Sequence, residues 1–292
     1  MSSSIVIFLI NKKMEYYKAS VYPYTILCKA ENSNVAYPYF RSIDGDKEML
    51  CISSHHGRSF IVGKHEDGRC VVSKGNGLSY SQYNLLFTGE FGDNTFGLLL
   101  EQDAIRDFTV GKEIAGLGIK TNRMEYVILL EKEITLSNGH RLKPVLLQYS
   151  VECPYRICDA AFPQYASAIK KEISKWEKYN DWGSDKYHLI AANVLIKNLK
   201  TLHTNNILHN AINFQNYTWA LELLDFELAC SPSYPYTKED DQRHVKDCFN
   251  REIMYTYEII KYIACYLDEP IDYKLIDSLF KMYGFDLSVL SV

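Results

Sequence analysis

A change of pattern near Cys153-Pro154 limits what this chain can fold into more than any other feature of its sequence. Before that point, short runs of β-forming residues alternate with glycine-containing turns. After it, apolar residues recur mostly at helical spacing. No linker rich in serine, glycine or proline divides the halves. The sequence therefore predicts an α+β, bilobal fold, with a β-rich N-lobe over residues 1–152 and a mainly helical C-lobe over residues 153–292.

The strand pattern is clearest in the middle of the first half. Arg58–Val62 and Arg69–Lys74 are rich in β-formers and flank a polar turn that contains glycine, which is typical of a hairpin. Glu125–Glu131 and Pro144–Tyr149 also have the composition of strands. Between these two pairs, residues 102–117 carry apolar side chains at helical spacing, so we expect one helix inside the β-rich lobe.

The second half contains several amphipathic patterns. We expect helices over residues 161–179, 187–203, 240–267 and 273–280. The intervening residues 206–230 have the composition of strands and loops, and the apolar run Trp219–Leu224 is predicted to be a strand that ends at Asp225.

Composition and charge exclude several functional classes. The 32 Lys and Arg against 36 Asp and Glu give a net charge of −4, without the concentrated positive charge that nucleic acids and anionic membranes attract. The apolar run Ile5–Ile10 is too short to span a bilayer and carries no signal-peptide features. We therefore expect a cytoplasmic protein with neither nucleic acid nor membrane as a partner. The eight cysteines contain no CxxC pair, which favours reduced thiols over a zinc site.

The bilobal order suggests a test for a kinase-like nucleotide site. In such sites a strand lysine holds phosphates, a helix carboxylate orients the lysine, and an asparagine and an aspartate hold metal ions. Lys74 ends a predicted strand before a glycine, and Asp107 lies on the next predicted helix. Considered singly, the two residues also fit a solvated turn and a surface charge.

A longer segment carries more of the pattern. His209–Asn216, followed by Asp225-Phe226-Glu227, fits H-x-D-x-x-x-x-N and D-F-G with two substitutions. Ala211 replaces the catalytic aspartate and Glu227 replaces the last glycine. Asn216 and Asp225 remain as candidate ligands for Mg²⁺ or Mn²⁺. The alternative is a hairpin with Asn216 in its turn and Asp225 capping a loop.

Three further stretches extend the match to a known family. Val72–Ser81, Ala104–Phe108 and Leu117–Arg123, together with the segment above, resemble the selenoprotein O family, over roughly residues 55–235. That family has a protein-kinase-like fold and transfers AMP from ATP to protein hydroxyl groups. The resemblance implies ATP with Mg²⁺ or Mn²⁺ as cofactors, and a protein substrate or partner.

The resemblance also implies roles for single residues. Lys74 matches the lysine that binds the ATP phosphates, and Asp107 takes the place of its helix glutamate. Asn216 and Asp225 match the two metal ligands. Arg156 matches, with one inserted residue, one of the two arginines that hold the nucleotide of that family.

Two positions depart from the family in ways that affect catalysis. Gln148 stands where the family has its other nucleotide-binding arginine, and Gln215 stands where it has its proposed base. An amide cannot take the substrate proton, so Gln215 is a weak catalytic candidate. Glu227 is the better candidate for a substitute base, although it too is only a weak one. Period-2 alternation in the predicted strand points Glu222 away from the metal.

A second resemblance leaves the substrate class open. His209-Asn210-Ala211 and Leu224–Glu227 are also similar to the choline and aminoglycoside kinases, which implies small-molecule phosphorylation. The remaining readings are an atypical transferase that moves AMP or phosphate to a protein hydroxyl, a pseudokinase that acts as a nucleotide-binding switch, and a scaffold that binds no nucleotide. The oligomeric state is not given by the sequence.

Overall fold

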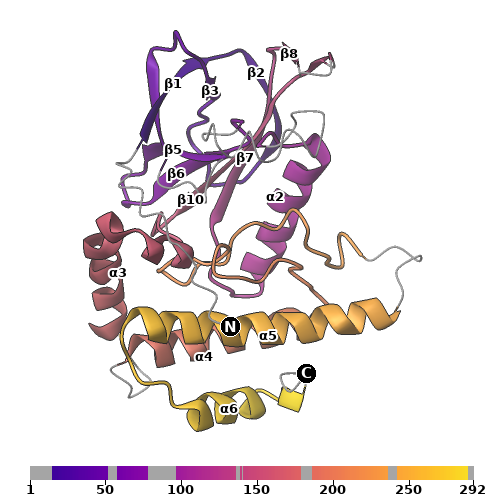
Figure 1. The fold of residues 1–292 in the computed structure, drawn as a ribbon. Coiled ribbons are helices and arrows are strands. Elements are labelled where there is room, and N and C mark those ends of the chain that lie inside the picture. Colours follow the sequence, from indigo (N-terminus) through magenta and orange to yellow (C-terminus); the bar gives the residue numbers. More distant parts are fainter. Residues whose placement is uncertain are drawn as a thin grey trace.

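The computed structural model describes residues 15–51, 58–77, 97–135, 139, 141–178, 186–235 and 242–288. Its strands gather at one end of the molecule and most of its helices at the other (Figure 1). We call residues 15–151 the strand-rich part and residues 152–288 the helical part. The α+β architecture predicted from the sequence, with strands first and helices second, is confirmed.

A single large sheet forms the strand-rich part. Its strand order is β2-β7-β10-β6-β5-β4-β1-β3, and every neighbouring pair is antiparallel. The strands are β1 (Glu15–Val21), β2 (Tyr24–Lys29), β3 (Tyr39–Arg41), β4 (Lys47–Cys51), β5 (Ser59–Lys64), β6 (Cys70–Lys74), β7 (Arg123–Leu130) and β10 (Val145–Val151). A separate small hairpin consists of β8 (Ile134–Thr135) and β9 (Arg141–Leu142). Because β6 lies between β10 and β5 inside the sheet, its last residue, Lys74, is buried.

One long helix lies against this sheet. α2 (Glu101–Gly116) follows β6 in the chain and corresponds to the helix predicted over residues 102–117. It packs on β7 and β10 (Figure 1). It buries Ala104, Phe108, Val110 and Ile114 on one face. This helix therefore brings a second set of side chains to the same end of the sheet as β6.

The helical part begins with two short 3₁₀ helices, η2 (Ile157–Ala161) and η3 (Pro163–Tyr165). Four α-helices follow, namely α3 (Ala166–Lys178), α4 (Tyr187–Thr204), α5 (Gln242–Tyr266) and α6 (Tyr273–Met282). The helix predicted from residue 161 starts later because Pro163 disfavours the α conformation of the residue before it. None of the helices among the described residues has the length and apolarity needed to cross a membrane.

The predicted strand Trp219–Leu224 is wrong. Leu221 has a φ of 56°, its amide donates to the Thr218 carbonyl at 2.9 Å, and the Thr218 amide donates to the Glu222 carbonyl at 3.0 Å, so the chain turns here. The Thr218 hydroxyl accepts a hydrogen bond from the Glu222 amide at 3.2 Å and stabilises the turn. Leu223 then forms only isolated bridges. The apolar run Ile5–Ile10 lies outside the described residues.

A glycine sets how closely α2 approaches its neighbours. A Cβ atom at Gly111 would lie 2.3 Å from the end of the Met124 side chain and 3.0 Å from the Phe226 ring. At Gly116, on the last turn of the same helix, a Cβ atom would meet nothing within 4 Å. The absence of a side chain at residue 111 therefore lets α2 pack on both β7 and the Asp225-Phe226-Glu227 segment.

We predict that Gly111→Ala lowers the free energy of unfolding by about 1–3 kcal/mol, because overpacking outweighs the gain in helix propensity. Gly116→Ala is the matched control, and it should raise the free energy of unfolding by up to about 1 kcal/mol. Urea unfolding measures both changes. Equal effects of the two substitutions would contradict the close packing at residue 111.

Candidate functional site

Lys74 occupies the centre of the candidate site. It is the last residue of β6, which is paired with β5 on one side and β10 on the other, and its side chain is only 3% exposed. Its Nζ atom lies 2.7 Å from Asp107 Oδ2, 2.6 Å from Asp225 Oδ1 and 3.4 Å from Glu227 Oε2. Burial alone would lower the pKa of Lys74, but Asp107 and Asp225 outweigh it and raise this pKa, so the ammonium keeps its proton.

Asp107 ties the helix to both of the other elements. It projects from α2, is 1% exposed, and accepts a hydrogen bond from the Phe226 amide at 3.0 Å on its second oxygen. Burial raises the pKa of Asp107, while Lys74 acts in the opposite direction. The carboxyl group therefore fixes the lysine with one oxygen and the Asp225-Phe226-Glu227 backbone with the other.

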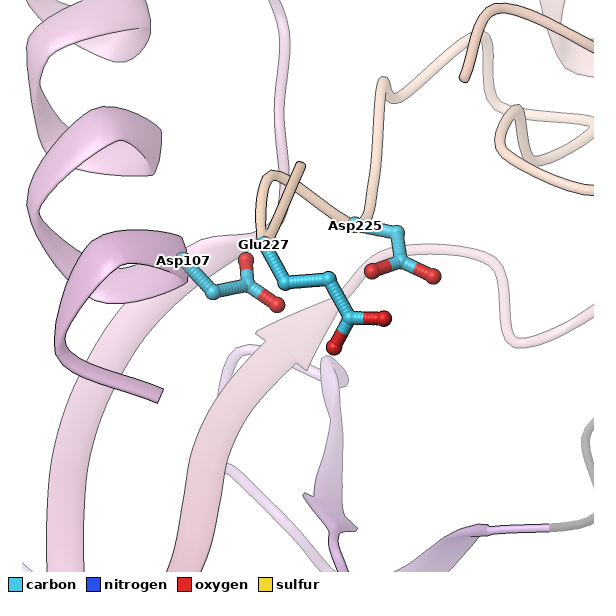
Figure 2. Close-up of side chains that lie close together, drawn as sticks. All are labelled: Asp107, Asp225 and Glu227. Atoms are coloured by element: carbon cyan, nitrogen blue, oxygen red, sulfur yellow. The ribbon is translucent and has the colours of Figure 1, made fainter. Parts of the chain in front are cut away.

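Asp225 and Glu227 complete a group of three carboxylates. Figure 2 shows Asp107 reaching from α2 toward Asp225 and Glu227, which extend from a separate loop. One oxygen of each residue lies within 4.8 Å of the others, the spacing of a metal-binding group. Burial would raise the pKa of Asp225, but Lys74 and Arg58 hold this pKa well below its ordinary value. Asp225 has a φ of 69°, a left-handed conformation that aspartate tolerates better than most residues.

Arg58 is a member of the site that the motifs did not identify. Its Nη2 atom forms an ion pair with Glu227 and lies 3.7 Å from Asp225 Oδ2. Its carbonyl accepts a hydrogen bond from the Gly75 amide at 2.9 Å. Arg58 could have been predicted from the expected hairpin. Antiparallel pairing of its strands places Ser59 opposite Lys74, so that Arg58 lies next to the lysine.

Asn216 lies beside the loop that carries Asp225. Its Nδ2 atom donates to the Ala211 carbonyl at 2.9 Å, and the residue is 5% exposed. Its own carbonyl accepts from the Leu224 amide at 2.9 Å, so its backbone lies beside the residue before Asp225. The structure therefore brings Asp225 together with Asp107 and Glu227, and the role of the Asn216 oxygen as a metal ligand stays a prediction.

The other predicted residues, Arg156 and Gln215, belong to the helical part. Arg156 donates from Nη1 to the Gln215 carbonyl at 3.0 Å, and its positive charge contributes to the lowered pKa of Asp225. Gln215 itself is exposed. At Ala211 only a methyl group stands at the position of the catalytic aspartate, so no general base is present there. His209 accepts from the Ala211 amide at 3.2 Å and its other ring nitrogen lies 2.8 Å from the Leu224 carbonyl, which stiffens this loop.

Gln148, at the position of the family's second arginine, has all its hydrogen-bond partners within the strand-rich part. It is fully buried and binds the Tyr37 amide, the Val35 carbonyl and Glu125, each at 2.8 Å. The side chain therefore fastens the segment before β3 to the sheet.

Glu222 fastens the connection between the two parts. Its buried carboxylate accepts hydrogen bonds from the Glu152 amide at 2.9 Å and the Cys153 amide at 3.3 Å, and it pairs with Arg69 at 2.9 Å. Burial raises the pKa of Glu222, while these donors oppose the rise. Its carboxylate therefore serves the connection, and not the group around Lys74.

The residues present suit a divalent cation in part. Three carboxylate oxygens are ligands that Mg²⁺ and Mn²⁺ accept. The Lys74 ammonium and the Arg58 guanidinium already neutralise these carboxylates, so a metal ion would compete with them. Asp225 and Glu227, which are 20% and 19% exposed, are the residues that would hold the ion.

A narrow cleft continues from this group between the two parts. It is bordered by Ser59, Phe60, Ile61, Val72, Tyr149, Val151, Cys153, Pro154, Arg156, Thr218 and Leu224. Its cavity volume is about 20 Å³, which is room for about one water molecule. The cleft is therefore too small to hold a purine ring as it stands.

Similarity to known proteins is limited. Comparison with protein families gave no match, and no curated protein sequence matched. Among solved structures, the chain is similar to the crystal structure of a rhoptry antigen kinase domain from Toxoplasma gondii, with 10% sequence identity and a TM-score of 0.41. The match covers 83% of this chain and 76% of that one. Within this chain, the helix carboxylate and the loop aspartate both lie within ion-pair distance of the strand lysine, as the corresponding groups do in protein kinases.

We predict that Arg58→Gln increases the affinity for Mn²⁺ about tenfold, because one positive charge next to Asp225 and Glu227 is removed. Titration of the protein with Mn²⁺, followed by electron paramagnetic resonance, measures the change. Arg141→Gln, at an arginine whose side chain is 72% exposed, is the control and should leave the affinity unchanged. Unchanged affinity in Arg58→Gln would show that this guanidinium does not compete with metal.

A second prediction concerns acid stability. Because the pKa of Asp225 is lowered on folding, its ion pairs stabilise the protein above the ordinary aspartate pKa of about 4 and lose this effect as the pH falls further. Asp225→Asn should therefore destabilise the protein most near neutral pH, and the difference from wild type should shrink below about pH 4. Urea unfolding across this range tests it. A difference that stays constant with pH would contradict the assigned charge state.

Proposed function

We propose that this chain is a kinase-like protein that binds ATP with its phosphates near Lys74 and a divalent cation at Asp225 and Glu227. The observation that carries this proposal is the buried Lys74 ammonium, held by Asp107 from α2 and by Asp225 from a distant loop. An ammonium and an adjacent carboxylate at the end of a strand are the groups that kinase folds use to bind phosphate and metal.

We further propose that the bound ATP donates AMP or phosphate to a protein hydroxyl. The resemblance to the selenoprotein O family supports this, since its lysine, helix carboxylate and loop aspartate match residues that meet at this site. Neither Ala211 nor Gln215 supplies a base, and Glu227 is paired with Arg58. Because the transition state is loose, losing a base costs about 10²–10⁴-fold and leaves slow transfer.

A nucleotide-binding switch without catalysis is the second candidate. The alanine at the position of the catalytic aspartate favours it, and so does Arg58, which neutralises the carboxylates that a metal would use. In this role, ATP would displace Arg58 from Asp225 and Glu227 and widen the narrow cleft. The conformational change, and not a product, would then be the output.

We predict that ATP with Mg²⁺ or Mn²⁺ raises the melting temperature, because a ligand that binds only the native state stabilises it by about 2.7 kcal/mol at a hundred times its Kd. Asp225→Ala should abolish the shift, whereas Asp46→Ala, at an aspartate whose side chain is 76% exposed, should retain it. Absence of any shift at millimolar ATP would reject nucleotide binding and leave a scaffold.

Isotope labels separate the proposed activities. Protein labelled from α-labelled ATP indicates AMP transfer, and protein labelled only from γ-labelled ATP indicates phosphorylation. Label on a small acceptor would favour the resemblance to the choline and aminoglycoside kinases. A thermal shift without label on any acceptor would identify the nucleotide switch.

A further inference from the structure

A second and larger pocket lies beside the C-terminal half of α2, and none of its lining residues lines the narrow cleft. Its cavity volume is about 440 Å³, within the range of pockets that hold small ligands. The walls come from residues 30–33, the start of β6, the second half of α2 and residues 119–124. This pocket is large enough to admit a small ligand as it stands, unlike the narrow cleft.

Positive charge dominates the wall of this pocket. Arg69, Lys112, Lys120 and Arg123 line it, against one acidic residue, Glu31. Lys112 is exposed, and among the described residues no carboxylate lies within ion-pair distance of it. The other three cations have carboxylate partners at the rim: Lys120 and Arg69 pair with Glu152 at 2.6 and 3.1 Å, and Arg123 pairs with Asp67 at 3.3 Å.

These rim pairs leave the cations available. Glu152 and Asp67 have 44% and 50% of their side chains exposed, so water screens both pairs and an incoming anion can replace either carboxylate at little cost. Arg69 is held in place from beneath by Glu222 and by the Ser150 carbonyl at 3.1 Å. Arg123 also donates to the Ser150 hydroxyl at 3.2 Å and lies 3.9 Å from the buried Glu125 carboxylate. The pocket therefore presents two held cations, Arg69 and Arg123, and two adjustable ones, Lys112 and Lys120.

Two buried polar atoms in the wall have no partner. Arg69 Nε is a donor without an acceptor, and Asn122 Oδ1 is an acceptor without a donor; they are two of five such atoms among the described residues. Asn122 is 2% exposed, and its side chain makes only a long contact, 3.9 Å from Nδ2 to the Met124 sulfur. Unpaired buried groups are costly, so their presence in one pocket indicates a ligand with both an acceptor and a donor. Because both atoms lie beneath the surface, the wall must adjust slightly to reach them.

From these features we infer that this pocket binds a small phosphorylated molecule with free hydroxyl groups, such as a sugar phosphate. The phosphate pairs with Arg69, Lys112, Lys120 and Arg123, and the hydroxyls supply the donors that Asn122 Oδ1 lacks. The C-terminal end of α2, whose carbonyls carry partial negative charge, also favours hydroxyl donors over a second anionic group.

The position of the pocket connects it to the Lys74 site. The amide of Asn122 donates to the Leu223 carbonyl at 3.3 Å, and the Lys120 carbonyl accepts from the Leu223 amide at 2.9 Å. Leu223 lies two residues before Asp225. Gly111 lines the pocket and packs toward Phe226, whose amide binds Asp107. A ligand here would contact the segments that position the three carboxylates.

Calorimetric titration of the full chain with ribose 5-phosphate and with inorganic phosphate tests the inference. We expect binding of ribose 5-phosphate, with inorganic phosphate at least tenfold weaker. Lys112→Glu should weaken ribose 5-phosphate at least tenfold without unfolding the protein, since Lys112 is exposed. Lys47→Glu, at a lysine on β4 whose side chain is 40% exposed, is the control and should bind as wild type does.

Asp225→Ala separates this site from the nucleotide site, because it should abolish the ATP shift and retain ribose 5-phosphate binding. Binding that is lost in Asp225→Ala but kept in Lys112→Glu would place the ligand in the Lys74 cleft and overturn the inference. No binding at millimolar concentration, or equal affinity for the two probes, would also overturn it. Failure of ATP to bind would leave this result unaffected, since the two sites share no residue.

Discussion

The buried ammonium of Lys74 is the interaction on which the arrangement of this molecule depends. It bonds to Asp107 from α2 and to Asp225 from the loop beyond α4, and it lies 3.4 Å from Glu227. A charge removed from water is tolerated only when its partners are close and well oriented, and removing one partner of a buried pair typically costs about 3–5 kcal/mol. Sheet, helix and loop are thus held together by one cation. Because Arg58 adds a second cation at the edge, the three carboxylates remain close despite their mutual repulsion.

The sheet order explains how the lysine reaches that position. β6 lies between β5 and β10, and the chain leaves β6 through glycines before it returns as α2. A lysine on an edge strand would reach water, whereas at the end of an inner strand it is enclosed by α2 and by the loop of the helical part. The cleft bordered by Ser59 and Leu224, the chain neighbours of Arg58 and Asp225, has a volume of only about 20 Å³.

Sequence reasoning identified the parts of the site that follow local patterns. Lys74, Asp107 and Asp225 stood in short motifs at fixed spacing, and the structure brings these three together. It missed Arg58, which enters through pairing between strands and carries no motif. The Asn216 amide nitrogen binds the Ala211 carbonyl, and the metal-ligand role of the Asn216 oxygen stays a prediction.

The remaining differences have similar physical causes. Trp219–Leu224 looks like a strand because it is apolar, but the Thr218 hydroxyl accepts a hydrogen bond that stabilises a turn. The cationic pocket is assembled from four separate segments, so no window of sequence contains it.

Glu222 makes the two parts of the chain depend on each other for their buried contacts. Although it belongs to the helical part, its carboxylate satisfies Arg69 of the strand-rich part and two amides of the connection. Separation of the chain at this connection would leave an arginine in one fragment and a glutamate in the other, each without its buried counterpart. Each fragment would therefore need the other to complete its buried ion pair. A fragment from a relative that lacks the Arg69–Glu222 pair could not replace either one.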